Sequence, residues 1–190
     1  MRLKRGEGQP NVEAVPCCQR YSAARVMTYP IDSKALANLL LDWADADGIP
    51  ISPMKLQKLL YFCHADFLGQ YGFGLIKQGF EAWDYGPVVP SIYKEFQQWG
   101  KRAIRSRAES FNPAEASRRE SVCELPSQEQ RTIRLIYERY RYRDAEELSD
   151  RSHERGGPWR HARSLFSNGL NMDRRITDEM IRNYHRLFHG

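Results

Sequence analysis

The chain has 190 residues, of which 41% are hydrophobic and 28% are charged, and its formal net charge is +5 at pH 7. This length is enough for one domain with a sizeable hydrophobic core. No apolar run approaches the roughly 20 residues of a membrane-spanning helix, and no segment resembles a secretory signal, so we expect a cytoplasmic protein without a membrane partner. The four cysteines form no C-x-x-C pair, which argues against a zinc site and a disulfide framework.

The charge is unevenly distributed along the chain. Residues 27–100 carry five basic and eight acidic side chains, whereas residues 101–190 carry nineteen and fourteen. A basic second half can bind nucleic acid, but its arginines alternate with glutamates and aspartates, as on a solvated helix face. A nucleic-acid-binding regulator is therefore an alternative that the charge pattern does not favour.

The first segments of the chain differ in periodicity. Residues 1–27 contain glycine, proline and charge without an apolar stripe, which predicts a disordered N-terminal extension that folding does not need. The folded domain is expected over residues 28–190. A helical pattern starts at Ile31, with Asp32 or Ser33 as its N-cap, and it ends at residues 47–50, Asp-Gly-Ile-Pro.

The next segment predicts the central helix of the domain. Ser52 supplies a cap oxygen and Pro53 occupies the first helical position. Apolar residues recur at helical spacing from Leu56 to about Tyr71, and Phe62 adds apolar surface to the other face. A helix that is apolar nearly all round is buried on all sides, so this helix should form the core.

A strand and a turn come after the central helix. Residues 75–85 read as one or two short strands, because three glycines between 69 and 74 interrupt the helical pattern. Pro87 and Pro90 exclude a central strand beyond this point. Helical spacing resumes between Ile92 and Trp99, so the chain turns from strand into helix at residues 86–90.

The second half of the chain predicts a loop and then further helices. Residues 101–126 are expected to be a loop with at most one strand, around Ile104. Residues 127–130 form a capping-box pattern at the start of a long helix, a second helix runs from Ala145 to about Gly156, and Thr177 caps a last one. The expected fold is a compact, mainly helical α+β domain with five to seven helices and a small β-sheet.

Histidines and cysteines are the first candidates for chemistry. His64 follows Cys63 directly, but adjacent helical residues point about 100° apart and cannot act as a dyad, so we interpret His64 as a core or interface residue. His185 and His189 have the i, i+4 spacing of two metal ligands, yet no carboxylate or cysteine at matching spacing accompanies them. We therefore predict no metal site.

Carboxylates and glycines complete the search for an active site. The acidic residues between 146 and 150 lie among arginines at helical spacing, which is typical of surface ion pairs. The glycines between 69 and 74 match neither a P-loop nor a dinucleotide fingerprint. The sequence thus predicts neither catalytic residues nor a cofactor.

Aromatic residues beside the strand-to-helix turn are the remaining candidates, and they suggest a protein interface. Aromatic rings bury a large area with few rotatable bonds, and a turn with glycine and proline is rigid before binding. The alternative is that the tryptophans simply fill the core. The predicted binding residues are Trp83, Tyr85, Gly86, Pro87, Val88 and Tyr93.

A second group of residues lies about 60 positions further along the chain. His153 precedes the loop that leads to Pro158 and Trp159. We expect its imidazole to hydrogen-bond a backbone group and fix this loop. The three residues are assigned a structural or interface function.

Three motifs in this order resemble one family. They are the helix K-L-Q-K-L-L-Y-F, the turn E-A-W-D-Y-G-P-V-V-P-x-x-Y and the segment H-x-x-x-x-P-W. Together they resemble the Panacea antitoxin family, which includes SocA-like and prophage-associated GepA-like proteins. Residues 175–179 look like the family's closing helix, and the resemblance extends from about Pro30 to Leu187.

The resemblance implies a function that the residues alone do not give. A member of this family is expected to bind a cognate protein toxin and neutralise it directly, or to act as a proteolytic adaptor that delivers the toxin to a cytosolic ATP-dependent protease. Family members pair with unrelated toxins. The alternative function is a nucleic-acid-binding regulator of a mobile genetic element.

Overall fold

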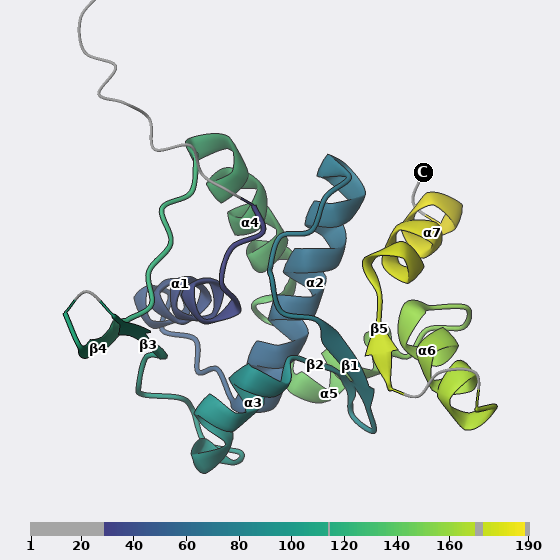
Figure 1. Cartoon of the computed structure of the whole chain (residues 1–190), viewed down its shortest axis with the longest axis horizontal. Coiled ribbons are helices and arrows are strands. Elements are labelled where there is room, and N and C mark those ends of the chain that lie inside the picture. Colours follow the sequence, from purple (N-terminus) through teal and green to yellow (C-terminus); the bar gives the residue numbers. More distant parts are fainter. Residues whose placement is uncertain (1–28, 114, 170–172, 189–190) are drawn as a thin grey trace, which may run out of the picture.

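The computed structural model describes residues 29–113, 115–169 and 173–188 (Figure 1). The predicted disordered extension, residues 1–27, lies outside this part. The strands form one three-stranded and one two-stranded sheet, which confirms a mainly helical α+β fold. The described elements are α1 (Ser33–Ala46), α2 (Pro53–Tyr71), β1 (Phe80–Trp83), β2 (Gly86–Val88), α3 (Pro90–Phe96), η1 (Gln97–Trp99), β3 (Glu109–Asn112), β4 (Ser117–Glu120), α4 (Ser127–Tyr140), α5 (Ala145–Ser152), α6 (Pro158–Ser167), β5 (Arg175–Ile176) and α7 (Asp178–Phe188).

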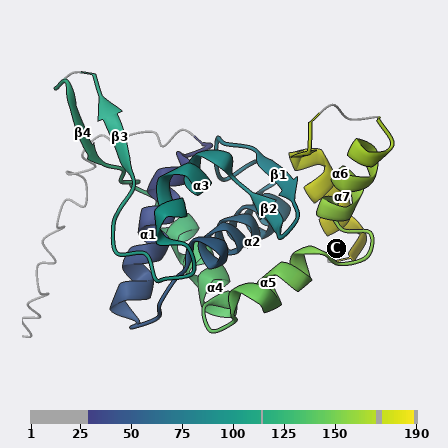
Figure 2. The same ribbon diagram turned by 90° about the horizontal axis from the view of Figure 1, so that it is seen from below.

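Helix α2 occupies the centre of the molecule, as predicted. The Ser52 hydroxyl accepts a hydrogen bond from the Lys55 backbone N–H at 3.4 Å, and Pro53 begins the helix. Gly72 ends it in the left-handed conformation at φ 78°, with its N–H donating to the Leu68 carbonyl at 2.8 Å. Helices α1, α3, α4, α5 and α7 all contact α2, and both views show it surrounded (Figures 1 and 2). Its burial on several sides confirms that this helix is the core.

The larger sheet joins segments that are far apart in sequence. Strand β1 pairs antiparallel with β2 on one side and with β5 on the other. Strand β5 covers residues that we expected at the start of the closing helix, whereas the structure starts α7 at Asp178. Thr177 caps α7 as predicted, because its hydroxyl accepts from the Met180 N–H at 3.2 Å. The sheet therefore attaches the C-terminal part of the domain to its middle.

Three predictions for the second half were wrong. Ile104 is buried but lies in no strand, and its N–H donates to the Ile51 carbonyl at 2.9 Å. A β3–β4 hairpin forms where we expected a loop. Ser127 is already inside α4, and its N-cap is Pro126 without a side-chain hydrogen bond, so the capping box does not form. In addition, α6 forms in a stretch for which no helix was predicted.

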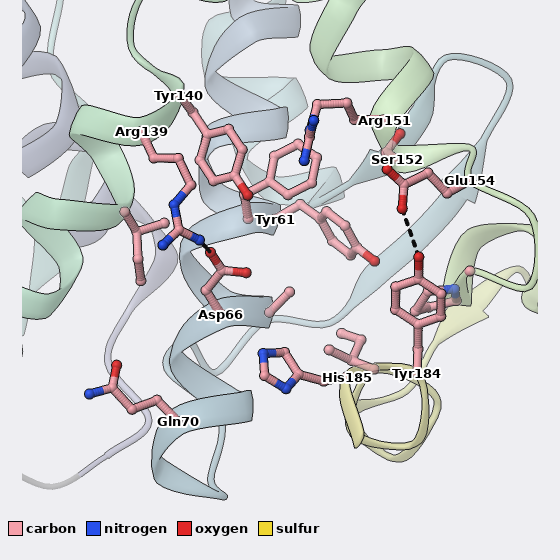
Figure 3. Close-up of a pocket in the computed structure, with 16 residues that line it drawn as sticks. Tyr61, Asp66, Gln70, Arg139, Tyr140, Arg151, Ser152, Glu154, Tyr184 and His185 are labelled. Carbon is pink, nitrogen blue, oxygen red and sulfur yellow. Dashed lines mark hydrogen bonds and ion pairs between the residues drawn. The ribbon is translucent and has the colours of Figure 1, made fainter. Parts of the chain in front are cut away.

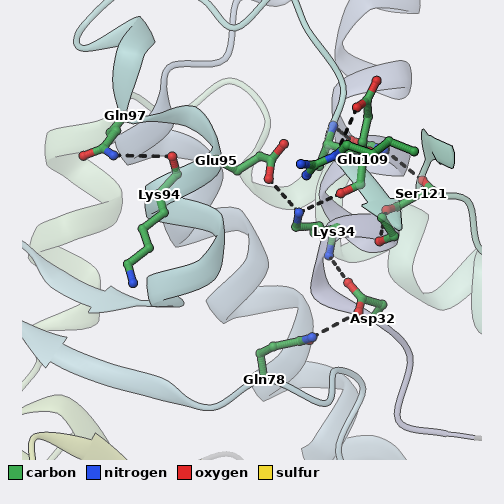
Figure 4. A network of polar contacts seen from close by, with 12 residues as sticks. Asp32, Lys34, Gln78, Lys94, Glu95, Gln97, Glu109 and Ser121 are labelled. Atoms are coloured by element: carbon green, nitrogen blue, oxygen red, sulfur yellow. Dashed lines mark hydrogen bonds and ion pairs between the residues drawn. The ribbon is translucent and has the colours of Figure 1, made fainter. Parts of the chain in front are cut away.

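A polar network fixes the start of α1 to the elements around it (Figure 4). The Asp32 carboxylate accepts from the Lys34 N–H at 2.8 Å, which caps α1, and from the Gln78 amide at 3.1 Å. The Lys34 ammonium pairs with Glu95 of α3 at 2.6 Å and also donates to the Glu109 carbonyl of β3 at 2.7 Å. This lysine thus joins α1, α3 and the hairpin.

The β3–β4 hairpin projects from the body of the molecule (Figure 2). Most of its residues are exposed on both faces. Asn38 on α1 is 2% exposed and fixes the hairpin's base through three hydrogen bonds of 2.8–2.9 Å, with Ala108 and Ser121. The hairpin therefore depends on α1 for its position.

None of the described helices is long and apolar enough to cross a membrane.

Candidate functional site

The β1–β2 connection forms the tight turn on which the predicted site lies. Trp83 pairs with Gly86, so Asp84 and Tyr85 are the two residues of the hairpin loop. Gly86 has φ +101°, a conformation that side chains rarely adopt. A Cβ at this position would also lie 2.5 Å from the Ser152 hydroxyl and 2.7 Å from the Lys58 ammonium. Glycine is required here for both reasons.

Two polar side chains of α2 support the strand that follows the turn. The Gln57 amide accepts from the Val89 N–H at 2.8 Å and donates to the Val89 carbonyl at 3.3 Å. The Lys58 ammonium donates to the Pro87 carbonyl at 3.1 Å. These backbone groups lie where a strand and a helix meet, so α2 satisfies polar atoms that the sheet leaves unpaired.

Helices α5 and α6 hold the same turn from a second direction. The Ser149 hydroxyl donates to the Tyr85 carbonyl at 2.9 Å, and the Trp159 indole N–H donates to the Trp83 carbonyl at 2.8 Å. The Arg163 guanidinium donates to the Asp84 carboxylate at 2.8 Å. The three motifs that resemble the Panacea family therefore meet at this turn, although they span more than 100 residues of sequence.

Lys58 is an unusual member of this group because it is 1% exposed. Burial disfavours the ammonium ion and lowers the pKa of Lys58 to about 7. The described structure offers it no carboxylate within ion-pairing distance, and its hydrogen bond goes to the Pro87 carbonyl. Lys58 is thus partly neutral at physiological pH and still holds the turn.

The predicted binding residues divide into an exposed and a buried group. The Tyr85 side chain is 73% exposed at the tip of the turn, and Tyr93 on α3 is 40% exposed. Trp83 is half-buried, and its ring centroid lies 4.9 Å from that of Tyr93. The rest of the predicted set, Gly86, Pro87 and Val88, is buried. We refer to the three predicted aromatic residues, Trp83, Tyr85 and Tyr93, together as the aromatic face.

The second predicted group, at residues 153–159, contributes to the support of the turn. The ring centroids of His153 and Trp159 are 3.8 Å apart. His153 Nε2 is buried without a hydrogen-bond partner in the described part of the chain, and the ring packs against Trp159 instead of making through this atom the backbone hydrogen bond that we expected of the imidazole. Burial lowers the pKa of His153. Pro158 is buried at the start of α6, and Trp159 is half-buried with its indole N–H on the turn.

The histidine of the central helix has a structural partner. His64 is 2% exposed, and its Nδ1 accepts from the Ile76 N–H at 3.3 Å, so its proton lies on Nε2. That nitrogen donates to Asp178 at 3.0 Å and thereby lowers the pKa of this carboxyl. Burial raises the pKa of the neighbouring Cys63 thiol. His64 is therefore a core residue that connects α2 to α7, as we expected.

The remaining candidates for chemistry do not gather into one site. His185 lies against Gly69 on α2, and His189 lies outside the described residues. Within residues 29–113, 115–169 and 173–188, no three histidine, cysteine, aspartate or glutamate side chains are placed to hold a metal ion.

Sequence reasoning missed the side chains that hold the turn from beneath. Gln57, Lys58, Ser149 and Arg163 were not selected, because single polar residues within helices are usually solvated. One signal was present for two of them. Gln57 and Lys58 lie in a helix that is apolar on nearly all sides, so a buried partner for each was required.

The comparisons with known proteins confirm the resemblance to the Panacea antitoxin family. Residues 56–160 match the family model for the SocA-like antitoxins with a Panacea domain, and the chain belongs to this family. It is also 36% identical over 164 residues to the Antitoxin SocA of Caulobacter vibrioides, which covers 83% of this chain and 84% of that protein. No solved structure matches the chain.

Proposed function

We propose that this protein is an antitoxin that binds a cognate protein toxin through the aromatic face and acts by binding rather than by catalysis. The observation that carries the proposal is the Tyr85 ring. It is 73% exposed, while its own backbone carbonyl is fixed by the Ser149 hydroxyl. Membership of the SocA-like family supports a toxin as the partner.

The rigidity of the turn supports binding at this place. Its backbone accepts hydrogen bonds from α2, α5 and α6, so little backbone entropy is lost when a partner orders it. Tyrosine and tryptophan rings at the centre of an interface supply much of the binding free energy. A fixed turn with exposed rings therefore suits a high-affinity contact.

Direct binding is the common step of the two modes of neutralisation. An antitoxin that occludes the toxin needs only this contact, and one that delivers the toxin to an ATP-dependent protease needs it first. Rescue from the toxin in cells that lack the ATP-dependent proteases distinguishes the two modes, because an antitoxin that occludes the toxin would still protect such cells and an adaptor would not.

The first prediction concerns the aromatic face. The toxin partner in the test is the product of the adjacent reading frame, whose expression should arrest growth unless this chain is also expressed. We expect Tyr85→Ala or Tyr93→Ala to weaken binding by about 2 kcal/mol, or roughly thirtyfold, without unfolding the protein. Isothermal titration calorimetry measures the affinity, and circular dichroism measures the fold.

The matched control is Tyr142→Ala. Tyr142 is 77% exposed and lies on the connection between α4 and α5, so its substitution removes the same ring from a different surface. This variant should bind as the wild type does. Wild-type affinity in a folded Tyr85→Ala/Tyr93→Ala double variant would exclude the aromatic face from the interface.

The nucleic-acid alternative makes an opposite prediction about salt. Phosphate contacts lose affinity by several orders of magnitude between about 50 and 200 mM salt. An interface built on aromatic rings should change little over this range. The toxin titration repeated at both salt concentrations, beside a titration with duplex DNA, separates the two functions.

A further inference from the structure

A pocket of about 410 Å³ lies between α2, α4, α5 and α7 (Figure 3). This volume is within the range of sites for small organic molecules. None of the three residues of the aromatic face lines it. The pocket is therefore separate from the surface assigned to the toxin, and a ligand bound in it is independent of the proposed function.

The first polar group of the pocket is the hydroxyl of Tyr61. The residue is 4% exposed, and its hydroxyl points into the pocket (Figure 3). It makes no hydrogen bond with any residue that the structure describes. Burial, together with the nearby Tyr184, Asp66 and Glu154, raises the pKa of Tyr61 far above its usual value, so the hydroxyl keeps its proton. A hydroxyl that opens into the pocket and has no hydrogen-bond partner in the described chain is a donor available to a ligand.

The second polar group is the guanidinium of Arg151. The other charged groups of the lining have partners, because Arg139 pairs with Asp66 at 3.1 Å and Glu154 accepts from the Tyr184 hydroxyl at 2.7 Å. Arg151 instead lies 5.8 Å from the centre of the Tyr140 ring and forms no ion pair within the described residues. A guanidinium without a carboxylate is a ready partner for an anion.

Part of the pocket wall is apolar and aromatic, beside the polar side chains. Phe62 and Tyr140 stack with ring centroids 4.6 Å apart, and Ile136 and Ile181 contribute aliphatic surface. Apolar walls with a few polar groups are the usual composition of small-molecule sites. The body of a ligand should therefore be a ring or a compact hydrocarbon.

We propose that this pocket binds a small-molecule carboxylate with an aromatic or apolar body, held by Arg151 and the Tyr61 hydroxyl. The carboxylate accepts hydrogen bonds from both donors, while the ring contacts Phe62 and Ile181. Two carboxylates, Asp66 and Glu154, line the same pocket as Arg139 and Arg151, so the lining has no excess of positive charge. It suits a single negative charge better than a phosphate dianion.

The test uses phenylacetate, phenylacetamide and phenethylamine, which share a ring and differ in charge. Titration of the full chain is followed by NMR of the isoleucine methyl groups, with Ile136 and Ile181 as reporters. We expect phenylacetate to saturate these shifts with a Kd of about 1 mM, a value in keeping with its ten heavy atoms. The neutral and cationic probes should bind at least about fivefold more weakly.

Two variants test whether Arg151 and the Tyr61 hydroxyl are the groups that bind the carboxylate. Arg151→Gln removes an exposed charge and should weaken phenylacetate binding about tenfold, and Tyr61→Phe keeps the buried ring and should weaken it about threefold. Arg155→Gln removes an exposed arginine outside the pocket lining and should bind as the wild type does. The proposal is overturned by equal binding of phenethylamine, by unchanged affinity in a folded Arg151→Gln variant, or by the absence of saturable shifts at about 20 mM phenylacetate, twentyfold above the expected Kd.

Discussion

Gly86 determines the path of the chain at the aromatic face. Its φ of +101° favours glycine, and the space where a side chain would start contains the Ser152 hydroxyl and the Lys58 ammonium. The turn can approach α2 and α5 closely only because this position has no side chain. A residue without a side chain thus decides where the exposed Tyr85 ring is presented.

The prediction for Gly86→Ala rests on these two constraints. We expect a loss of more than about 2 kcal/mol in the free energy of unfolding. Alanine is strained at a φ of +101°, and its methyl group would clash with Ser152 and Lys58. Urea denaturation measures it. The control is Gly79→Ala, since a Cβ there has no atom within 4 Å and no positive φ, and it should change stability little. Equal stability of both variants would show that the turn relaxes freely.

Because Lys58 is buried, the free energy of unfolding should depend on pH between about 7 and 10.5. Its pKa is lowered to about 7 in the folded state and returns to the ordinary value of about 10.5 on unfolding. Between these values the unfolded chain binds more protons than the folded chain, so stability rises with pH. The charged, buried form destabilises the fold fully below pH 7, and this effect is relieved as pH rises.

The test compares the wild type with Lys58→Met across pH 7 to 9. The difference between their free energies of unfolding should move in favour of the wild type by about 1 kcal/mol per pH unit. Subtraction removes the contribution of the other titrating groups, including Cys63. The exposed Lys101→Met variant should show the wild-type slope. A difference that is flat with pH would mean that Lys58 is solvated in the folded protein.

At the level of elements, the sequence predicted the parts that depend on local patterns. The apolar periodicity of α2, its Ser52 cap and its end among the glycines at 69–74 are all encoded within about 20 consecutive residues; the structure confirms them and ends the helix at Gly72. The Asp32 cap of α1 and the Thr177 cap of α7 are equally local. Caps and apolar stripes need no knowledge of distant residues, which is why they were found.

The elements that sequence reasoning missed depend on distant partners. Strand β5 has two residues and exists because it pairs with β1, about 95 positions earlier. The β3–β4 hairpin is rich in charge and has little apolar alternation, so its residues resemble a loop. Its stability comes from Asn38 and Lys34 on α1, which no local pattern reveals.

Asn38 offers a direct test of that dependence. Asn38→Ala leaves the Ala108 N–H and the Ser121 carbonyl without their side-chain partner, which should destabilise the protein by about 2 to 4 kcal/mol. Hydrogen exchange should accelerate in residues 109–120 more than in α2. Arg118→Ala, at an exposed position of β4, is the control and should leave the exchange of α2 and the hairpin base unchanged. Uniform acceleration throughout the chain would contradict a local function of Asn38.

At the scale of the whole molecule, α2 connects most of the described helices. It contacts helices from both ends of the described chain as well as strand β2. The hydrophobic core is correspondingly one cluster that extends from Ile31 to Ile181. Each of the helices α1, α3, α4, α5 and α7 would expose a face of α2 if it separated from the rest.

Cooperative unfolding is the corresponding prediction. The tryptophans lie in α1, β1, η1 and α6, so their fluorescence reports on much of the molecule, while far-UV circular dichroism reports on the helices. The two urea transitions should coincide within error, as expected for a single domain of this size. An earlier fluorescence transition would indicate that the region around β1 and α6 opens independently.

The candidate site was predictable only in its exposed part. Tyr85 and Tyr93 were selected because they are aromatic residues beside a turn with glycine and proline, and the structure places both at the surface. The buried support from Gln57, Lys58 and Ser149 depends on three segments meeting in space. The spacing of these residues in the sequence does not show that they lie close together in the fold.

The turn has a buried side that holds the fold and an exposed side to which we assign toxin binding. Gly86, Pro87 and Val88 face the interior, whereas the Tyr85 ring makes none of the hydrogen bonds that hold the turn. Under the proposed function, substitutions at exposed positions such as 85 and 93 would change the partner while the same internal contacts keep the backbone in place. A scaffold of this kind can acquire new partners during evolution without first losing stability.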